Sequence, residues 1–254
     1  MAVYTRSREE IDRIRVSAQL VAKTLRELGR AIRPGVTTGE LDRIAEGFIR
    51  DHGATPAFKG YRGFPASICP SVNEEVVHGI PGSRELREGD IVGIDVGVEK
   101  DGFFGDAART FAVGDVSDEA RKLMDVTRDS LMQGIAQARA GNRVGDISNA
   151  VQSLVERSGF SVVRALVGHG IGREMHEEPA VPNFGPSGRG PRLMAGLVLA
   201  IEPMVNAGGS EVVTRPDGWT VATKDGALSA HFEHTVAVGL DGPEILSELP
   251  DGEN

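Results

Sequence analysis

Apolar residues recur with helical spacing in two segments near the start of the chain. The first runs over residues 7–30 and opens with Ser7 and Glu10, a serine followed three residues later by a glutamate, which is the sequence form of a capping box. The second runs from about residue 38 to residue 53, with Thr38 as the expected N-cap and a glycine at its end. The pattern therefore predicts two amphipathic helices before the first strands.

The same order of a long helix and then a shorter one returns later in the chain. Helices are predicted over 118–139, after Ser117 as N-cap, and over 144–157. Two amphipathic helices can look alike by chance, but here glycines match at both ends, which favours a duplicated helix–helix–strand unit. The expected halves are about 31–116 and 117–240, after an N-terminal helix over 1–30. At a constant shift of 106, the matched residues are Gly35, Gly39, Glu40, Leu41, Phe48, Ile49 and Gly53 with Gly141, Gly145, Asp146, Ile147, Leu154, Val155 and Gly159.

Short runs rich in β-branched and aromatic residues predict strands after each helix pair. A stretch rich in Pro, Gly and Ser over 182–191 predicts a surface loop, but no linker divides the chain, so a single α+β domain over 1–254 is expected. The predicted strands cover 67–69, 91–98, 103–113, 161–167, 197–204, 219–221 and 228–238.

Two aspartates lie close together in the predicted hairpin. If 99–102 forms a four-residue loop, Val98 faces Phe103 and Asp95 lies opposite Asp106. Like charges directly opposed across two strands are destabilising, so a positive group is expected between them. The pair is consistent with a divalent-cation site. The alternative is that one aspartate turns to solvent at a bulge.

Two further acids stand in apolar strand sequence. Glu202 lies 107 residues after Asp95, on the equivalent strand of the second half, and Glu233 lies between Phe232 and a histidine. A buried carboxylate needs a partner, and metal ions can supply one. His169, in a Gly-His-Gly-Ile-Gly stretch, could reach such a site, although on its own the stretch favours a histidine in a glycine-rich turn. No βαβ unit surrounds these glycines, which argues against nucleotide binding.

Composition narrows the kinds of protein that this chain can be. It has 254 residues, of which 40% are hydrophobic, so a sizeable core can form. The single cysteine, Cys69, excludes an intrachain disulfide and cysteine-rich zinc sites, which leaves carboxylate and imidazole as metal ligands. No apolar run is long enough for a membrane span or a signal peptide, so a cytoplasmic protein is expected. A net charge of −9 argues against direct nucleic-acid binding.

The motifs resemble, in order and spacing, those of type I methionine aminopeptidases. The resemblance extends from the first helix to about residue 238 and implies the pita-bread fold, a pseudo-two-fold α/β architecture of duplicated halves around an antiparallel sheet. This agrees with the internal repeat. The stretches that carry the resemblance are 93–97, 105–106, 168–173 with 176–179, 201–203 and 232–235.

The resemblance also implies a dinuclear metal site. Asp95 would chelate one divalent metal ion (Co, Mn, Fe or Zn), Asp106 and Glu233 would bridge two ions, and His169 and Glu202 would complete the two sets of ligands. A hydroxide bridging the ions would attack the first peptide bond of the substrate. Glu202 would double as the proton shuttle.

Further residues are assigned to substrate binding by the same resemblance. His78 and His176 would contact the substrate and stabilise the tetrahedral intermediate, although each could instead be a surface imidazole. Two positions depart from the family pattern: Met175 replaces an aromatic residue and Phe58 replaces a common cysteine, which leaves the width of the methionine pocket open. Its walls would include Tyr61, Phe64, Cys69 and Trp219, with Met175 near the entrance.

The implied reaction is removal of the N-terminal methionine from nascent polypeptides, with a preference for a small second residue. The protein is expected to act as a monomer with transient ribosome contact. A monovalent cation near Asn73 and Ser229 is a further implication. Two alternatives stay open: a proline-specific peptidase of the same superfamily, and a non-catalytic pita-bread binding protein. The first usually has an extra N-terminal domain, and the second usually lacks the metal ligands.

Overall fold

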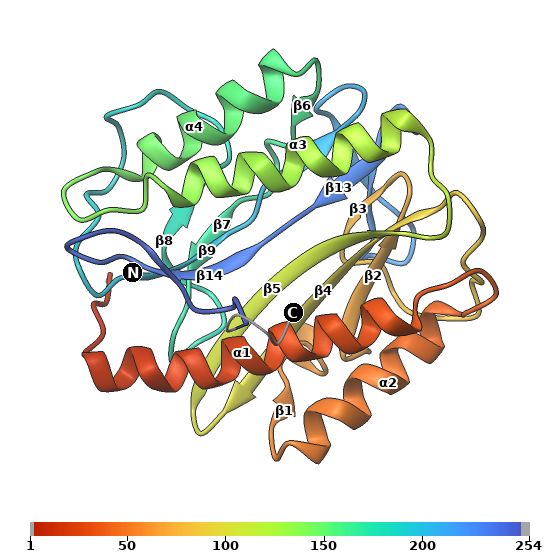
Figure 1. Cartoon of the computed structure of the whole chain (residues 1–254), viewed down its shortest axis with the longest axis horizontal. Helices are drawn as coiled ribbons and strands as arrows, with labels where there is room; N and C mark the ends of the chain where they lie inside the picture. Colours follow the sequence, from red (N-terminus) through yellow and green to blue (C-terminus); the bar gives the residue numbers. More distant parts are fainter. Residues whose placement is uncertain (1–2, 250–254) are drawn as a thin grey trace.

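Four α-helices, one 3-10 helix (Tyr61–Gly63) and a set of antiparallel strands build the structure, a computed structural model that describes residues 3–249. Helices α1 (Arg8–Ala31) and α2 (Thr38–Asp51) form one pair, and α3 (Asp118–Ile135) and α4 (Val144–Arg157) form the other. In Figure 1 the long strands pass between the two pairs. The bounds of α2 and α4 differ by 106 residues at both ends, as the internal repeat predicts.

The helices begin where local side chains satisfy their first N–H groups. Ser7 and Glu10 form the predicted capping box at the start of α1. The N-cap of α2 is Thr37, not the expected Thr38, because Thr37 pairs with Glu40 in a second capping box. Helix α3 ends at Ile135, four residues before the expected end.

The strands form four antiparallel sheets. One has the order β1-β4-β2 with β5 paired to β4, and another has the order β15-β14-β9-β7-β8. The smaller two are β13-β10-β6 and β11-β12-β3. The strands are β1 (Thr55–Pro56), β2 (Ile68–Val72), β3 (Glu75–Val77), β4 (Ile91–Lys100), β5 (Phe103–Ala112), β6 (Ser161–Val162), β7 (Gly168–Gly170), β8 (Glu177–Val181), β9 (Val198–Ile201), β10 (Met204–Asn206), β11 (Val212–Thr214), β12 (Val221–Thr223), β13 (Ser229–His231), β14 (His234–Ala237) and β15 (Glu244–Ile245).

The β4–β5 hairpin has a different register from the one expected. Asp101 and Gly102 form a two-residue turn, both with positive φ, which an Asp-Gly pair favours. Gly97 therefore faces Asp106, and Asp95 faces Ala108. The predicted pairing of Asp95 with Asp106 is wrong by two residues. Because side chains alternate with a period of two, both aspartates still lie on the same face of the hairpin.

Two long strands expected in the second half are interrupted. The segment 197–204 breaks into β9 and β10 at Glu202 and Pro203, where proline cannot donate a ladder hydrogen bond. The segment 228–238 breaks into β13 and β14 at Phe232 and Glu233. Strand β6 is also shorter than expected. The interruptions fall where two of the strand acids stand.

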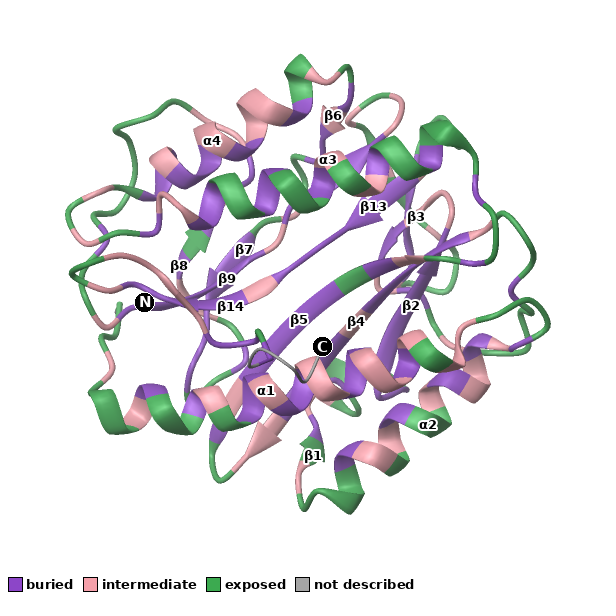
Figure 2. Ribbon diagram, viewed as in Figure 1, coloured by how far each residue is buried: buried purple, intermediate pink, exposed green. Residues whose placement is uncertain are grey.

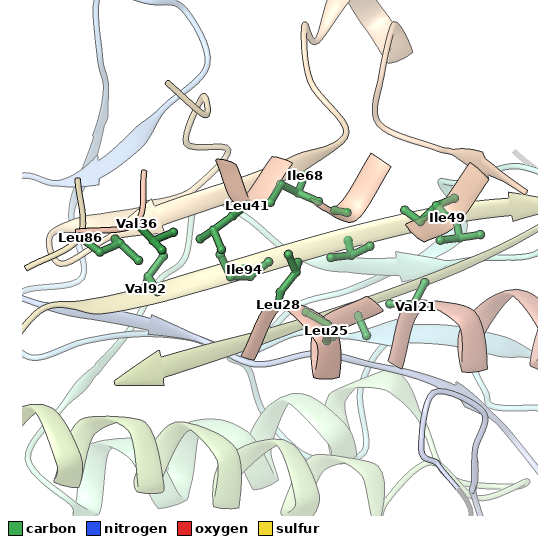
Figure 3. Close-up of a cluster of buried hydrophobic side chains, with 14 of the residues drawn as sticks. Val21, Leu25, Leu28, Val36, Leu41, Ile49, Ile68, Leu86, Val92 and Ile94 are labelled. Carbon is green, nitrogen blue, oxygen red and sulfur yellow. The ribbon is translucent and has the colours of Figure 1, made fainter. Parts of the chain in front are cut away.

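The core lies between the helices and the sheets. Figure 2 shows buried residues along the strands and exposed residues on the outer faces of the helices. In the cluster of Figure 3, Leu25 and Leu28 of α1 and Ile49 of α2 pack against Ile68 and Ile94 of the sheet. No helix in the described part of the chain has the length and apolar character needed to cross a membrane.

Helix α1 packs tightly against β5 at Gly105. A Cβ atom added there would lie 2.4 Å from the backbone nitrogen of Ala18, which cannot move aside as a side chain can. We expect Gly105→Ala to destabilise the protein by about 1–3 kcal/mol, a typical cost of overpacking. Urea unfolding of the variant beside Gly47→Ala, where a Cβ meets nothing, checks this. Equal midpoints would contradict it.

Candidate metal and substrate site

A pocket of about 150 Å³ brings together every residue that the resemblance assigned to the divalent metal ions or to the substrate. Its acids come from β4, β5 and the two strand interruptions, so both halves of the chain contribute. Its apolar wall comes from residues 58–69, Met175 and Trp219. The full lining consists of Phe58, Tyr61, Arg62, Phe64, Cys69, His78, Asp95, Asp106, His169, Met175, His176, Glu202, Trp219 and Glu233.

The acidic end of the pocket has the composition of a metal site. Ligand atoms of Asp106, His169 and Glu233 all lie within 4.8 Å of one another. One oxygen each of Asp95, Asp106 and Glu233 is buried without a hydrogen-bond partner. Buried carboxylate oxygens with no partner are costly unless a cation takes that place. The residues present therefore fit divalent metal ions.

Burial determines the protonation of these acids when no cation is present. It raises the pKa of Asp95 and of Glu202 to about 7. Burial, together with the neighbouring carboxylates, raises the pKa of Asp106 and of Glu233 well above the usual range. All four carboxyl groups therefore resist ionisation in the metal-free fold, and a nearby positive charge would lower their pKa values.

His169 has a ring orientation suited to metal binding. Its Nδ1 lies 2.9 Å from the carbonyl oxygen of Gly170. Because a carbonyl only accepts, Nδ1 carries the proton, and a neutral ring then leaves the lone pair on Nε2. Nε2 lies 3.6 Å from Glu202 Oε1, at the acidic end of the pocket.

His231 is a residue of this region to which the sequence gave no role. Its Nε2 is buried without a hydrogen-bond partner and lies 3.6 Å from Glu202 Oε2, whereas His169 approaches the other oxygen of that carboxylate. Burial lowers its pKa, so the ring is neutral. The signal was its position two residues before Glu233, which alternation places on the same strand face.

Two histidines that line the pocket, His78 and His176, are neutral. Burial lowers the pKa of His78 to about 4 and that of His176 to about 3. Nδ1 of His176 lies 3.0 Å from the Tyr61 hydroxyl, and the two rings are stacked at 5.3 Å. Both rings line the pocket, where His78 is half-buried and His176 is exposed.

A buried ion pair holds the loop that carries His176. The side chains of Arg6 and Glu177 are in contact and almost fully buried. Glu177 Oε1 also accepts hydrogen bonds from the backbone N–H groups of Arg173 and Glu174. Glu177 therefore links this loop both to the Arg6 side chain and to the backbone at residues 173 and 174.

The remaining wall of the pocket is apolar. Phe58, Phe64, Cys69 and Met175 are buried together, and the rings of Phe64 and Trp219 meet edge to face at 5.2 Å. Burial raises the pKa of Cys69 well above that of a free thiol, so the group is an uncharged wall atom. The space suits an unbranched apolar side chain.

Asn73 and Ser229 lie together but outside this pocket. The Ser229 N–H donates to the Asn73 carbonyl at 2.9 Å. Their side chains bond to Asp90 and Asn206, respectively. The two residues are neighbours, as a shared cation site would need, and the monovalent cation itself stays a prediction.

Comparison with known proteins identifies the family. Residues 12–239 match the model of Metallopeptidase family M24. The chain belongs to this family. It is 59% identical to a methionine aminopeptidase of Clostridium perfringens over 96% of this chain and 98% of that protein. The structure superposes on the crystal structure of methionine aminopeptidase from Rickettsia prowazekii with a TM-score of 0.96 and 43% identity, covering 97% and 100% of the two chains. Membership of this metallopeptidase family implies divalent metal ions, and the pita-bread fold is confirmed.

A more distant likeness concerns the proline-specific alternative. An Xaa-Pro dipeptidase from Bacillus anthracis has a TM-score of 0.78 and 23% identity, with 97% of this chain matching 62% of that one. At this identity the likeness shows the shared fold alone. The match leaves a large part of the dipeptidase without a counterpart in this chain.

Proposed function

We propose that this metallopeptidase removes the N-terminal methionine from proteins and peptides, with a preference for a small second residue. The observation that carries the proposal is the adjacency of an apolar pocket to a cluster of buried acids. A methionine side chain in the apolar part would bring its own amino group and first peptide bond to the acids. The 59% identity to a methionine aminopeptidase supports this.

Five residues would hold two divalent metal ions in this proposal. Asp95, Asp106, His169, Glu202 and Glu233 all line the pocket. Asp106 and Glu233 would be shared by both ions. Ions bound there would supply the positive charge that acidifies a water molecule and polarises the carbonyl of the first peptide bond. Co, Mn, Fe and Zn all accept such oxygen and imidazole ligands, and their availability would decide among them.

Glu202 is proposed to move the proton during hydrolysis. One carboxylate oxygen lies 3.6 Å from Nε2 of His169, and the other lies 3.6 Å from Nε2 of His231. A carboxylate beside the attacking water can accept its proton and later deliver it to the departing amine. The amine then leaves as the shortened peptide.

His78 and His176 are proposed to donate to the substrate. As neutral rings in the pocket, each carries one N–H. When the Tyr61 hydroxyl donates to Nδ1 of His176, the ring proton is on Nε2. That N–H can stabilise the negative charge that develops on the carbonyl oxygen.

The apolar wall is proposed to select methionine. Phe58, Phe64 and Met175 narrow a space that favours an unbranched, flexible thioether over a β-branched side chain. Tyr61, Cys69 and Trp219 complete this wall. We further propose nascent polypeptides as the substrates, in the cytoplasm, for a monomer that contacts the ribosome transiently and holds a monovalent cation near Asn73 and Ser229.

Peptide hydrolysis tests the function. With Mn, Fe or Co supplied, we expect release of methionine from Met-Ala-Ser, abolished by a chelator. A methionine side chain would fill much of the pocket of about 150 Å³ and leave little room for a bulky second side chain. Met-Leu-Ser should therefore react at least about tenfold more slowly in kcat/KM. Chromatography of the products measures both reactions. Cleavage of an X-Pro peptide with no release of methionine would refute the proposal.

A further inference from the structure

Strand β5 and the segment 231–235 lie side by side but are not joined by a regular backbone ladder. They belong to different sheets, and in Figure 1 β5 and β14 run next to each other between α1 and α3. Asp106 comes from β5, in the first half of the chain, and Glu233 comes from the second half. The boundary between β5 and segment 231–235, here called the seam, therefore separates the two acids proposed to be shared by both metal ions.

Threonine hydroxyls connect the two sides of the seam. Thr235 Oγ1 accepts a hydrogen bond from the Asp106 N–H at 3.0 Å and donates to the Asp106 carbonyl at 2.6 Å. Thr110 Oγ1 makes the same pair of bonds to His231, accepting from its N–H at 2.9 Å and donating to its carbonyl at 2.9 Å. Each threonine thus brackets the backbone of one residue across the seam.

The two brackets form one regular arrangement. The pairs Asp106–Thr235 and Thr110–His231 lie two residues to either side of a direct bond, in which the Glu233 N–H donates to the Ala108 carbonyl at 2.9 Å. This is an antiparallel register in which the outer contacts use a hydroxyl in place of a backbone group. Both threonines are buried, so their bonds are shielded from water.

We infer that Thr235 and Thr110 are positioning residues that fix the spacing between Asp106 and Glu233. The inference rests on the proposed metal-ligand roles of these two acids. A ligand shared by two ions must be held at a fixed distance from the other shared ligand. Thr235 holds the backbone of Asp106 through two hydrogen bonds. The backbone hydrogen bond of Glu233 lies between the Thr235 and Thr110 contacts. Ser247 adds support, because its Oγ accepts the Thr235 N–H at 3.0 Å.

Replacing the threonine hydroxyl by a methyl group tests the contribution of these hydrogen bonds alone. Thr235→Val keeps the shape of the side chain but leaves the buried N–H and carbonyl of Asp106 without partners. We expect the Kd for Mn²⁺ to rise about tenfold or more, as for other groups that orient metal ligands. Thr235→Ser keeps the hydroxyl and should stay within about threefold of the wild type. Thr110→Val should raise the Kd in the same direction.

The test is titration calorimetry with Mn²⁺ on the metal-free full chain, at a temperature where circular dichroism shows each variant to be folded. Thr24→Val is the matched control, because it removes a buried hydroxyl bond to the Leu20 carbonyl in α1. Its Kd should match the wild type. If Thr235→Val does not fold, Thr110→Val carries the test.

Each outcome bears on a definite claim. An unchanged Kd in the folded Thr→Val variant overturns the inference, as does an equal loss in Thr24→Val, since the effect would then be one of general stability. A wild-type chain that binds no Mn²⁺ would instead refute the proposed metal roles of Asp106 and Glu233. The inference is supported by weakened binding that serine rescues and the control does not share.

Discussion

Replacing Asp106 with asparagine is expected to abolish methionine release, with kcat falling about a thousandfold or more. The substitution preserves size but removes a charge from a group that is 4% exposed and lies within 4.8 Å of ligand atoms of His169 and Glu233. If Asp106 is shared by both ions, its loss weakens both. Glu233→Gln should act in the same way, because it removes the corresponding charge from the other side of the pocket.

Asp101→Asn is the matched control for Asp106→Asn. It makes the same chemical change in the same hairpin, at an exposed turn residue whose positive φ asparagine tolerates. Its turnover and Mn²⁺ stoichiometry should equal those of the wild type. Steady-state kinetics with Met-Ala-Ser and calorimetry measure these quantities. Near-normal turnover and full metal content in Asp106→Asn would contradict the shared-ligand assignment.

Removal of the metal ions is expected to make stability fall as pH rises above about 7. Burial raises the pKa of Asp95, Asp106, Glu202 and Glu233 in the metal-free fold, so the folded chain retains protons that the unfolded chain has lost. A carboxyl with a raised folded pKa stabilises fully below its unfolded pKa, and this contribution is lost as pH rises through the folded value. The slope is about 1.4 kcal/mol per pH unit for each retained proton.

The pH window follows from the histidines. Burial lowers the pKa of His78, His176, His231 and His234, which makes stability rise with pH up to their unfolded value of about 6.5. Below about pH 6.5 the carboxyl groups make stability fall as pH rises and the histidines make it rise, so the two effects oppose each other. Between about pH 7 and about pH 8.5 only the carboxyl effect remains among these groups, so the thermal midpoint of the chelator-treated protein should drop by several degrees.

Calorimetric melting with and without Mn²⁺ measures this dependence. The loaded protein should lack the drop, because bound cations hold the carboxyl groups ionised in the folded state. The stabilisation by Mn²⁺ should therefore grow across the window. A metal-free midpoint that is constant or rises with pH would show that these acids are not buried together in the absence of metal.

Much of the fold followed from local pattern. The helix pairs were predictable because apolar spacing, capping residues and flanking glycines agree, and the shift of 106 in the sequence relates α2 to α4. The fold itself followed from the resemblance. The strand interruption at Glu202 had a signal in Pro203, which cannot donate a ladder hydrogen bond, whereas the interruption at Glu233 has no such signal and depends on tertiary packing.

The site shows the same division. Asp95 and Asp106 stood out as acids in apolar strands, yet their register was predicted wrongly because Asp101 and Gly102 were placed in a four-residue loop and not in a two-residue turn. The two aspartates still share one face of the hairpin, because the observed register differs from the predicted one by an even number of residues. His231 was given no role, because its place on the same strand face as Glu233 does not show that it will meet Glu202 across the fold.

The seam also affects how the chain can fold during synthesis. Thr235 and Asp106 are separated by 129 residues, and they can meet only by closing a long loop. The hairpin with Asp95 and Asp106 emerges from the ribosome well before Glu233 does. Until then, Asp95 and Asp106 lack the residues of the second half that line the same pocket, and nothing favours the burial of these two acids. The first half is therefore expected to stay open until the second half arrives, and the catalytic centre to be among the last parts of the molecule to form.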